Sequence, residues 1–319
     1  MNAIPSISSQ IDEKIVLKVI DKHFSRLAPY YYKWINSWLI GAYENFGNID
    51  KYIILIYIIN KNFIFFRKNG LIVDYDTFYN DETLEVEKIN ISKISKDLQI
   101  PKESVRRKIE ELKKAEIIKR KGKQIFVNRM AIPLVQANLT LKNMSGLLYE
   151  FNKILKEEDI VEVAYPNTAI SDSIKKNFSF VWYQFYKFLF IFTNRWRKEL
   201  GDLETFTIGV IVLINAAENK SFKLKELTRK KYSISIQGSD ERGVNAMSIS
   251  DITGIPRITV IRKLKKMIKR NLLQINEKKL ITVNILGDEF VKVQALQDEN
   301  MASLSNFVNR VFNQIKVIR

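Results

Sequence analysis

The chain has 319 residues, of which 46% are hydrophobic, and it carries a formal net charge of +17. This length suits two domains, and this composition is ordinary for a globular protein with a core of its own. The lack of cysteine excludes disulfides and thiolate metal sites, and a single histidine, His23, excludes multi-histidine metal clusters.

The N-terminal residues lack the basic start and apolar run of a secretory signal. Two apolar stretches, Ile53–Phe66 and Phe180–Thr193, are each interrupted by Asn or Lys and fall short of the roughly 20 residues that cross a membrane. We therefore expect buried core helices, no membrane partner, and a soluble protein in the cytoplasm, associated with the nucleoid.

The first part of the chain predicts a long aromatic-rich helix that Pro29 kinks or breaks, because proline removes a helical hydrogen bond. This helix is expected at about Lys18–Phe46. A second apolar helix is expected near Asp50–Asn62, followed by a variable connection at Lys68–Lys88. A further motif then precedes a closing helix at about Leu141–Lys156.

The motif at 91–128 has the pattern of a helix-turn-helix. Ile91–Leu98 predicts a short support helix and Gln99–Pro101 a tight turn, with Pro101 suited to the start of the next helix. Val105, Ile109 and Leu112 recur at helical spacing and predict one buried stripe. The opposite face would expose the candidate DNA-binding residues Lys102, Ser104, Arg106 and Arg107.

After this helix the periodicity changes to strand, basic turn and strand over Ile117–Val127. This pattern predicts a wing, a hairpin whose tip can lie along a phosphate backbone. Its candidate phosphate-binding residues are Lys119, Arg120, Lys121 and Lys123.

The second part of the chain repeats the first. Residues 249–280 align with 94–125 without a gap, at an offset of 155 and with nine identical pairs. Gly254 occupies the turn, and Val260, Leu264 and Met267 repeat the stripe. The candidate DNA-binding residues here are Arg257, Thr259 and Arg262, interleaved with Ile258 and Ile261, and Lys278 in a second wing at Leu272–Thr282.

Weaker matches extend the repeat, with helices expected at Ser171–Leu200, Glu204–Glu218 and Met301–Ile315. The connection Ser221–Asn245 contains β-like runs such as Tyr232–Ile236. We therefore predict a duplication, with a first repeat at 1–160 and a second at 161–319 whose motif spans 246–284.

Positive charge is concentrated on the two motifs. Ser92–Asn128 and Met247–Asn284 each carry a net charge of +7, and together hold +14 of the +17. Matching basic segments indicate a polyanionic partner at both. From Lys102, Arg106, Arg107 and its wing, we expect the first segment to be the stronger electrostatic anchor.

The two motifs resemble the winged helix-turn-helix of bacterial transcriptional regulators, most closely at Gly254–Leu273 through the Gly-Ile-Pro turn, the Thr-Val pair and Arg262. The flanking helices are similar in arrangement to those of MarR-type (multiple antibiotic resistance) regulators, where such helices build a dimer interface. The resemblance implies a mainly α fold with small β wings, in which two tandem winged halves form an intramolecular pseudo-dimer. It also implies sequence-specific binding of double-stranded DNA and regulation of transcription, by a monomer or a homodimer.

Two other functions remain open: a replication-initiator-like DNA-binding protein, and a scaffold whose winged helices bind proteins. No phosphate-binding glycine motif or serine–histidine arrangement indicates an enzyme, and no cofactor or metal is expected. The aromatic helices predict core packing, against the alternative of a ligand cavity lined by Tyr31, Trp34, Tyr183 and Tyr186 for an effector of unknown chemistry.

Overall fold

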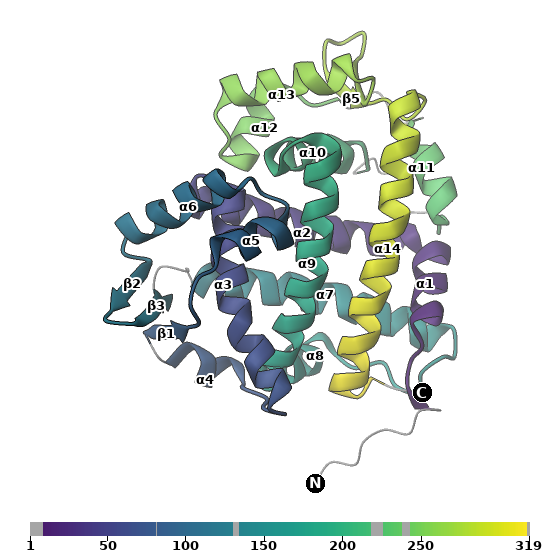
Figure 1. Ribbon diagram of the computed structural model, residues 1–319. Helices are drawn as coiled ribbons and strands as arrows, with labels where there is room; N and C mark the ends of the chain where they lie inside the picture. The colour runs from purple at the N-terminus through teal and green to yellow at the C-terminus, as the bar shows by residue number, and fades with distance from the viewer. Residues whose placement is uncertain (1–8, 81, 130–133, 218–225, 238–242, 318–319) are drawn as a thin grey trace.

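The computed structural model describes residues 9–80, 82–129, 134–217, 226–237 and 243–317 (Figure 1). The described chain is mainly helical, with two small antiparallel sheets. The predicted class, mainly α with small β elements, is therefore confirmed.

The described residues of the first half form seven helices and one three-stranded sheet of order β1-β3-β2. Its elements are α1 (Glu13–Lys22), α2 (Phe24–Phe46), α3 (Ile49–Lys68), α4 (Tyr75–Asn80), β1 (Thr83–Val86), α5 (Ile91–Leu98), α6 (Lys102–Lys114), β2 (Ile118–Lys121), β3 (Gln124–Asn128) and α7 (Leu134–Glu157). The sequence did not single out β1, which pairs with β3 through Leu84 and Val127.

The second half repeats this order. Its elements are α8 (Asn167–Lys176), α9 (Phe178–Leu200), α10 (Leu203–Ala217), α11 (Arg229–Gln237), α12 (Ala246–Thr253), α13 (Arg257–Lys269), β4 (Leu273–Ile275), β5 (Ile281–Val283) and α14 (Asp288–Ile315). Helices α8, α9, α12 and α13 have the lengths of α1, α2, α5 and α6 and begin 154 or 155 residues later. In place of β1, a single bridge joins Val244 to Ile281.

The two halves share one core. Trp34 of α2 is fully buried and stacks on Phe188 of α9 and Phe307 of α14, with ring centroids 5.6 and 5.3 Å apart. Since large aromatic rings dominate the apolar area that a core removes from water, these contacts join the halves strongly.

Packing between the halves is reciprocal. Within the halves, α2 packs on α7 and α9 packs on α14; between them, α3 packs on α9 while α10 packs on α2. In Figure 1, α3, α9 and α14 stand side by side while α2 and α7 cross behind them. The helices that open each half are exchanged, because α1 packs mainly on α14 and α8 mainly on α7.

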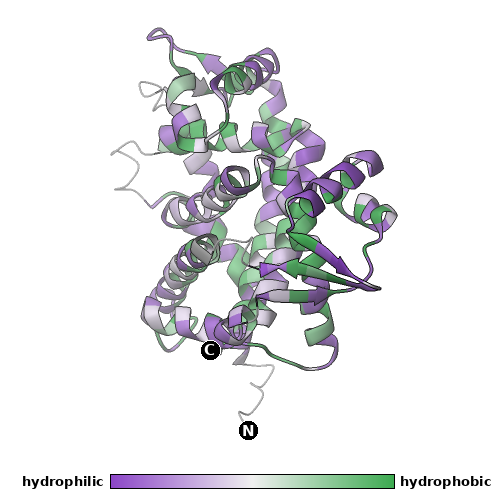
Figure 2. Ribbon diagram, turned by 90° about the vertical axis from the view of Figure 1, so that its left-hand side faces the viewer, coloured by the Kyte–Doolittle hydropathy of each residue, from purple (hydrophilic) through white to green (hydrophobic). Residues whose placement is uncertain are grey.

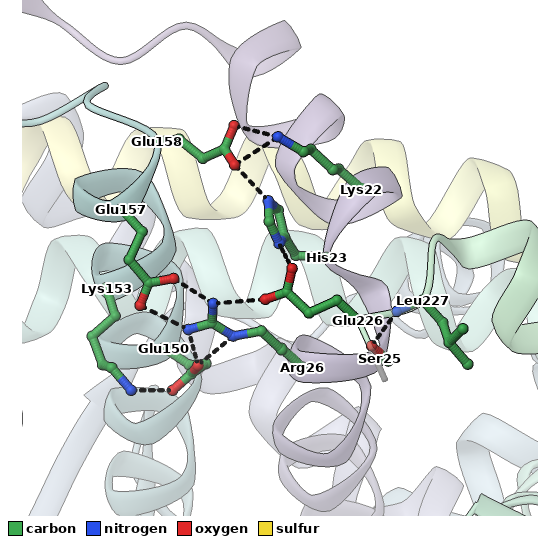
Figure 3. A network of polar contacts seen from close by, with 10 residues as sticks. All are labelled: Lys22, His23, Ser25, Arg26, Glu150, Lys153, Glu157, Glu158, Glu226 and Leu227. Carbon is green, nitrogen blue, oxygen red and sulfur yellow. Dashed lines mark hydrogen bonds and ion pairs between the residues drawn. The ribbon is translucent and has the colours of Figure 1, made fainter. Parts of the chain in front are cut away.

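A polar network fixes the junction between α1 and α2 against the end of α7 (Figure 3). The Arg26 guanidinium pairs with Glu157 and donates to Glu150 Oε1 at 2.7 Å. Lys22 Nζ donates to Glu158 at 2.7 Å, and the buried His23 places Nε2 3.0 Å from the same carboxylate. His23 is thus buried within this junction and contacts a carboxylate at the C-terminal end of α7.

Several expected element bounds were wrong. The long helix of each half breaks at His23 and at the equivalent Asn177, whereas α2 continues through Pro29. The run Tyr232–Ile236 lies in helix α11, because burial of Tyr232 and Ile236 follows the spacing of one helical turn and leaves Ile234 exposed. Two parts of the expected connection Ser221–Asn245, 221–225 and 238–242, lie outside the described residues, as does residue 218 at the end of the helix expected at Glu204–Glu218.

No single helix of the described chain is long and apolar enough to cross a membrane. Only α9 and α10 taken together reach that length and composition, and they meet at an angle of 92°. The predicted core role of α9 is confirmed, because most of its apolar side chains are buried against the other helices.

Candidate nucleic-acid interface

Two units of the same construction lie at neighbouring sides of the molecule, the first unit at 91–128 and the second unit at 246–284 (Figure 1). Each contains an eight-residue helix, a short turn, a 13-residue helix and an antiparallel hairpin. Asparagine caps both first helices: Asn90 Oδ1 accepts from the Lys93 amide at 3.0 Å and Asn245 Oδ1 from the Ser248 amide at 2.9 Å.

The turn between the two helices is held identically in both units. The Ser95 hydroxyl donates to the Ile100 carbonyl at 2.7 Å, and the Ser250 hydroxyl donates to the Ile255 carbonyl at 2.8 Å. The residue that ends the first helix is left-handed in each case, Gln99 at φ 52° and Gly254 at φ 67°. Glycine adopts this conformation without strain, so only the first unit bears a backbone cost there.

The inner face of each longer helix matches the predicted stripe. Val105, Ile109 and Leu112 of α6 are buried, and the same holds for the equivalent residues of α13, Val260, Leu264 and Met267. These stripes pack α6 onto α3 and α13 onto α10. Each unit is thereby fixed to the central helices of its own half, with the opposite face of its longer helix turned outward.

The same inner faces also hold two buried lysines that the stripe pattern did not single out. Lys108 Nζ donates to Asn48 Oδ1 and Lys263 Nζ donates to Asp202 Oδ1, both at 2.6 Å. Asn48 caps α3 and Asp202 Oδ1 accepts from the Thr205 amide at the start of α10. Burial lowers the pKa of Lys108, an effect that nearby Asp50 and Glu111 oppose. In the sequence, only the identity of Lys108 and Lys263 at an offset of 155 pointed to these two buried lysines.

The outer face of α6 carries charges of both signs. Lys102, Arg106 and Arg107 are exposed and Ser104 is half-buried. Arg106 Nη1 lies 3.0 Å from Glu103 Oε2, and Arg107 Nε lies 3.9 Å from Glu111 Oε1. The four residues farthest from the core are Glu103, Arg107, Glu110 and Lys114, a stripe of alternating sign.

The charged residues on the outer face of α13 are all basic. This helix contains six Lys or Arg residues and no acid, against six basic residues and three Glu in α6. Arg257 and Arg262 are exposed and Thr259 is half-buried, beside an Ile258 that is 84% exposed. The stripe farthest from the core is Ile258, Arg262, Lys265 and Lys269. Sequence patterns had missed Lys265 and Lys269.

The hairpins show the opposite balance. Lys119, Arg120, Lys121 and Lys123 of the first hairpin are all exposed, whereas Lys278 and Lys279 are the exposed basic residues of the second. Lys119 pairs with Glu116 at 3.1 Å and Arg120 Nε donates to the Gly122 carbonyl at 2.8 Å. Figure 2 shows mostly hydrophilic residues along the outer helix of the first unit and both hydrophilic and hydrophobic residues along its strands.

The sequence predicted that the first unit is the stronger electrostatic anchor, and these exposed residues change that comparison. The first unit is the more basic at its hairpin, but the second is the more basic along its longer helix, because Glu103, Glu110 and Glu111 offset the arginines of α6. The two units therefore offer a polyanion different surfaces.

The second half of the chain holds the first unit in place. Arg197 of α9 donates from Nη1 to the Leu98 carbonyl at 2.8 Å and from Nη2 to Asp50 Oδ1 at 2.7 Å. Asn194 Nδ2 donates to the Asp97 carbonyl at 2.9 Å. These bonds satisfy carbonyls at the end of α5 that have no partner within the helix.

No cluster of three or more His, Asp or Glu side chains in the described part of the chain has the arrangement of a metal site. Comparison of the chain with protein-family models, with curated proteins and with solved structures gave no match.

Proposed function

We propose that this protein binds double-stranded DNA through two winged helix-turn-helix units and regulates transcription. The observation that carries the proposal is the repetition of one construction: in both units the inner stripe is buried and the opposite face of the 13-residue helix carries exposed Arg or Lys. Helix-turn-helix proteins use this outer face to contact bases in the major groove, while a wing contacts the backbone.

In this proposal the two units make different contacts with DNA. Arg257 and Arg262, exposed on α13, would contact base edges, where arginine can pair bidentately with guanine, and the exposed Ile258 would contact a thymine methyl group. The first hairpin supplies four cations for phosphate contacts that carry affinity but little sequence information. The second unit would accordingly contribute more of the sequence preference and the first wing more of the salt dependence.

Reciprocal packing of the halves supports a pseudo-dimer. The contact of α3 with α9 is matched by the contact of their repeat equivalents, α10 with α2. Such a matched pair of contacts is isologous, as in two-fold dimers. Two-fold related helix-turn-helix units bind inverted half-sites, whereas the direct repeats of replication origins favour a repeated, head-to-tail arrangement. An imperfect inverted repeat is therefore the target we propose.

Selection of binding sites from random duplexes tests the target, followed by anisotropy titration of Arg107→Ala and Arg262→Ala. Each variant should lose about 1–3 kcal/mol of binding free energy if its arginine contacts a base. Lys142→Ala, an exposed lysine of α7, is the matched control and should bind like the parent chain. Selection of direct repeats would favour an initiator, and unchanged affinity in both arginine variants would favour a protein-binding scaffold.

A further inference from the structure

A cavity of about 140 Å³ lies beneath the second unit. Its walls come from α2, α9, α10 and α11, from the end of α13, from both strands of the second hairpin and from α14. They are mostly apolar and aromatic, and include Tyr31, Phe192, Trp196 and Phe206. An apolar cavity of about 150 Å³ is large enough to take up benzene, so this space fits a small organic molecule.

The first half has the same walls but almost no space. Trp38, Tyr52, Phe185 and Tyr186 occupy the positions of Phe192, Phe206, Tyr31 and Tyr32 at an offset of 154, and they enclose only about 20 Å³. Two size differences accompany the smaller space: Tyr79 lines it where Ser233 lines the larger cavity, and a buried Leu55 stands where the second half has Gly209. The cavity is therefore specific to the second half and is not a by-product of the shared fold.

The walls of the larger cavity also differ in polarity. Tyr31 Oη, Trp196 Nε1 and Gln297 Nε2 are buried and have no hydrogen-bond partner among the described residues. The positions equivalent to these three by the repeat hold Phe185, Ala42 and Thr140. Buried polar groups without partners are costly and rare in native proteins, so three around one cavity indicate a missing partner.

All three of these groups can donate a hydrogen bond. An indole N–H and an amide NH₂ are donors only, and burial raises the pKa of Tyr31, which keeps its hydroxyl protonated. Gln297 lies close enough to Tyr31 to oppose that shift in part, although the two polar atoms do not meet in hydrogen-bond geometry. The missing partner is consequently an acceptor.

We propose that this cavity binds a small, mainly apolar molecule, about the size of a substituted benzene ring, that carries an acceptor oxygen such as a carbonyl. The apolar walls favour the body of the molecule, and the three donors select its oxygen. This site depends only on the residues of the cavity and not on the proposed DNA binding.

Its position also gives the site a route to regulation, and this part rests on the proposed function. Met267, near the end of α13, lines the cavity, and a Cβ atom at Gly209 would lie 3.5 Å from its Sδ. Leu272, Leu273 and Val283 line it from the hairpin. A bound molecule thus packs directly under the helix and hairpin of the second unit and shifts its DNA affinity.

Calorimetric titration with acetophenone and its isostere α-methylstyrene, which lacks only the carbonyl oxygen, tests the site. Acetophenone should bind at least about 10-fold more tightly, because the hydrocarbon leaves buried donors unpaired. Failure of both compounds to bind, or equal affinity for the two, would overturn the proposal.

Three variants sharpen this test. Gly209→Leu with Ser233→Tyr installs the residues of the first half and should abolish acetophenone binding while the chain stays folded. If that chain fails to fold, Trp196→Phe keeps the ring, removes the donor, and should lower acetophenone affinity several-fold while leaving that of α-methylstyrene unchanged. Tyr79→Phe in the first half is the control and should bind acetophenone like the parent chain.

DNA titrations with and without saturating acetophenone separate the two proposals. A changed affinity in the parent chain, absent from the cavity-filled variant, supports coupling. Unchanged DNA affinity would refute coupling but not the site, and acetophenone binding by a chain with no duplex affinity would refute the proposed function alone.

Discussion

The Nζ atom of Lys263 donates a hydrogen bond to Oδ1 of Asp202 at 2.6 Å, so this cation of the second unit is directed into the protein. Lys265, two residues later on the same helix, is exposed. Substitutions of Lys263 and Lys265 therefore distinguish an effect on stability from an effect on DNA binding. Lys263→Met should lower the free energy of unfolding by about 1–3 kcal/mol, because it leaves a charged acceptor without its donor.

Lys265→Met should instead leave the unfolding free energy within about 0.5 kcal/mol of the parent and weaken DNA binding. Urea unfolding followed by circular dichroism measures the first effect, and anisotropy at fixed salt measures the second. If Lys263→Met weakened DNA binding more than Lys265→Met at equal fractions of folded protein, the assignment of faces would be wrong.

The first hairpin should account for much of the salt dependence. Replacing Lys119, Lys121 and Lys123 by Gln removes up to three cations that neutralise phosphates. The slope of log affinity against log salt should therefore become shallower by up to about 0.9 for each phosphate that is no longer neutralised, equally for specific and unrelated duplexes. Lys142→Gln with Lys176→Gln, two exposed lysines on α7 and α8, forms the control. An unchanged slope in the hairpin variant would exclude the wing from the interface.

The network around Arg26 should make stability fall in acid. A hydrogen bond from Arg26 lowers the pKa of Glu157, and one from Lys22 lowers the pKa of Glu158, both below an ordinary value of 4.5. A depressed folded-state pKa means that the carboxylates stabilise the protein fully above pH 4.5. That stabilisation is lost as the pH falls through their folded-state pKa values.

Melting temperatures of the parent and of Glu157→Gln with Glu158→Gln, measured from pH 7 to pH 3, check this sign. The parent should melt higher at pH 7, and the difference should shrink below pH 4.5. The exposed Glu162→Gln serves as the control. A gap between parent and double variant that stays constant down to pH 3 would contradict the expectation.

Gln99 and Gly254 offer an internal comparison of backbone strain. Gln99→Gly should raise the free energy of unfolding by up to about 1 kcal/mol, because it relieves a left-handed conformation. Gly254→Ala should lower it by a similar amount for the same reason, since a Cβ there would meet Glu44 Cγ only at an ordinary 3.5 Å. Denaturant unfolding compares both with the parent, and a stability loss in Gln99→Gly would show that its αL geometry is not strained.

The sequence predicted the two units well because their buried stripes, turns and hairpins depend on local spacing. Val105, Ile109 and Leu112 and their counterparts lie where helical periodicity places them. Local patterns failed where contacts distant in sequence decide the outcome. The 13 residues of α14 before Met301 lack a strong apolar stripe, yet Asp288 and Glu289 in the first turn and a bond from Arg270 Nη2 to Glu289 at 2.7 Å favour helix there.

In the candidate site, too, contacts distant in sequence decide what local patterns could not predict. A lysine in a basic helix gives no sign that it will be buried, and Lys108 and Lys263 are buried because Asn48 and Asp202 lie opposite them. Of the four aromatic residues considered for a ligand cavity, Tyr31 lines the larger space, Tyr186 lines the nearly filled one, and Trp34 packs in the core. Tyr183 lies under the Arg67 guanidinium. The open and the nearly filled cavity differ at Gly209 and Ser233, two small residues that a search for aromatic patterns does not pick out.

The exchange of α1 and α8 between the halves has a consequence for folding. Ile11, just before α1, donates from its amide to Asn313 Oδ1 at 2.9 Å, and Asn313 Nδ2 donates back to the Ile11 carbonyl at 3.0 Å. The segment before α1 is thereby joined to α14, and the first repeat does not complete its packing until α14 has been synthesised. We expect a single cooperative unfolding transition, in which both units unfold together and no half survives as a folded fragment.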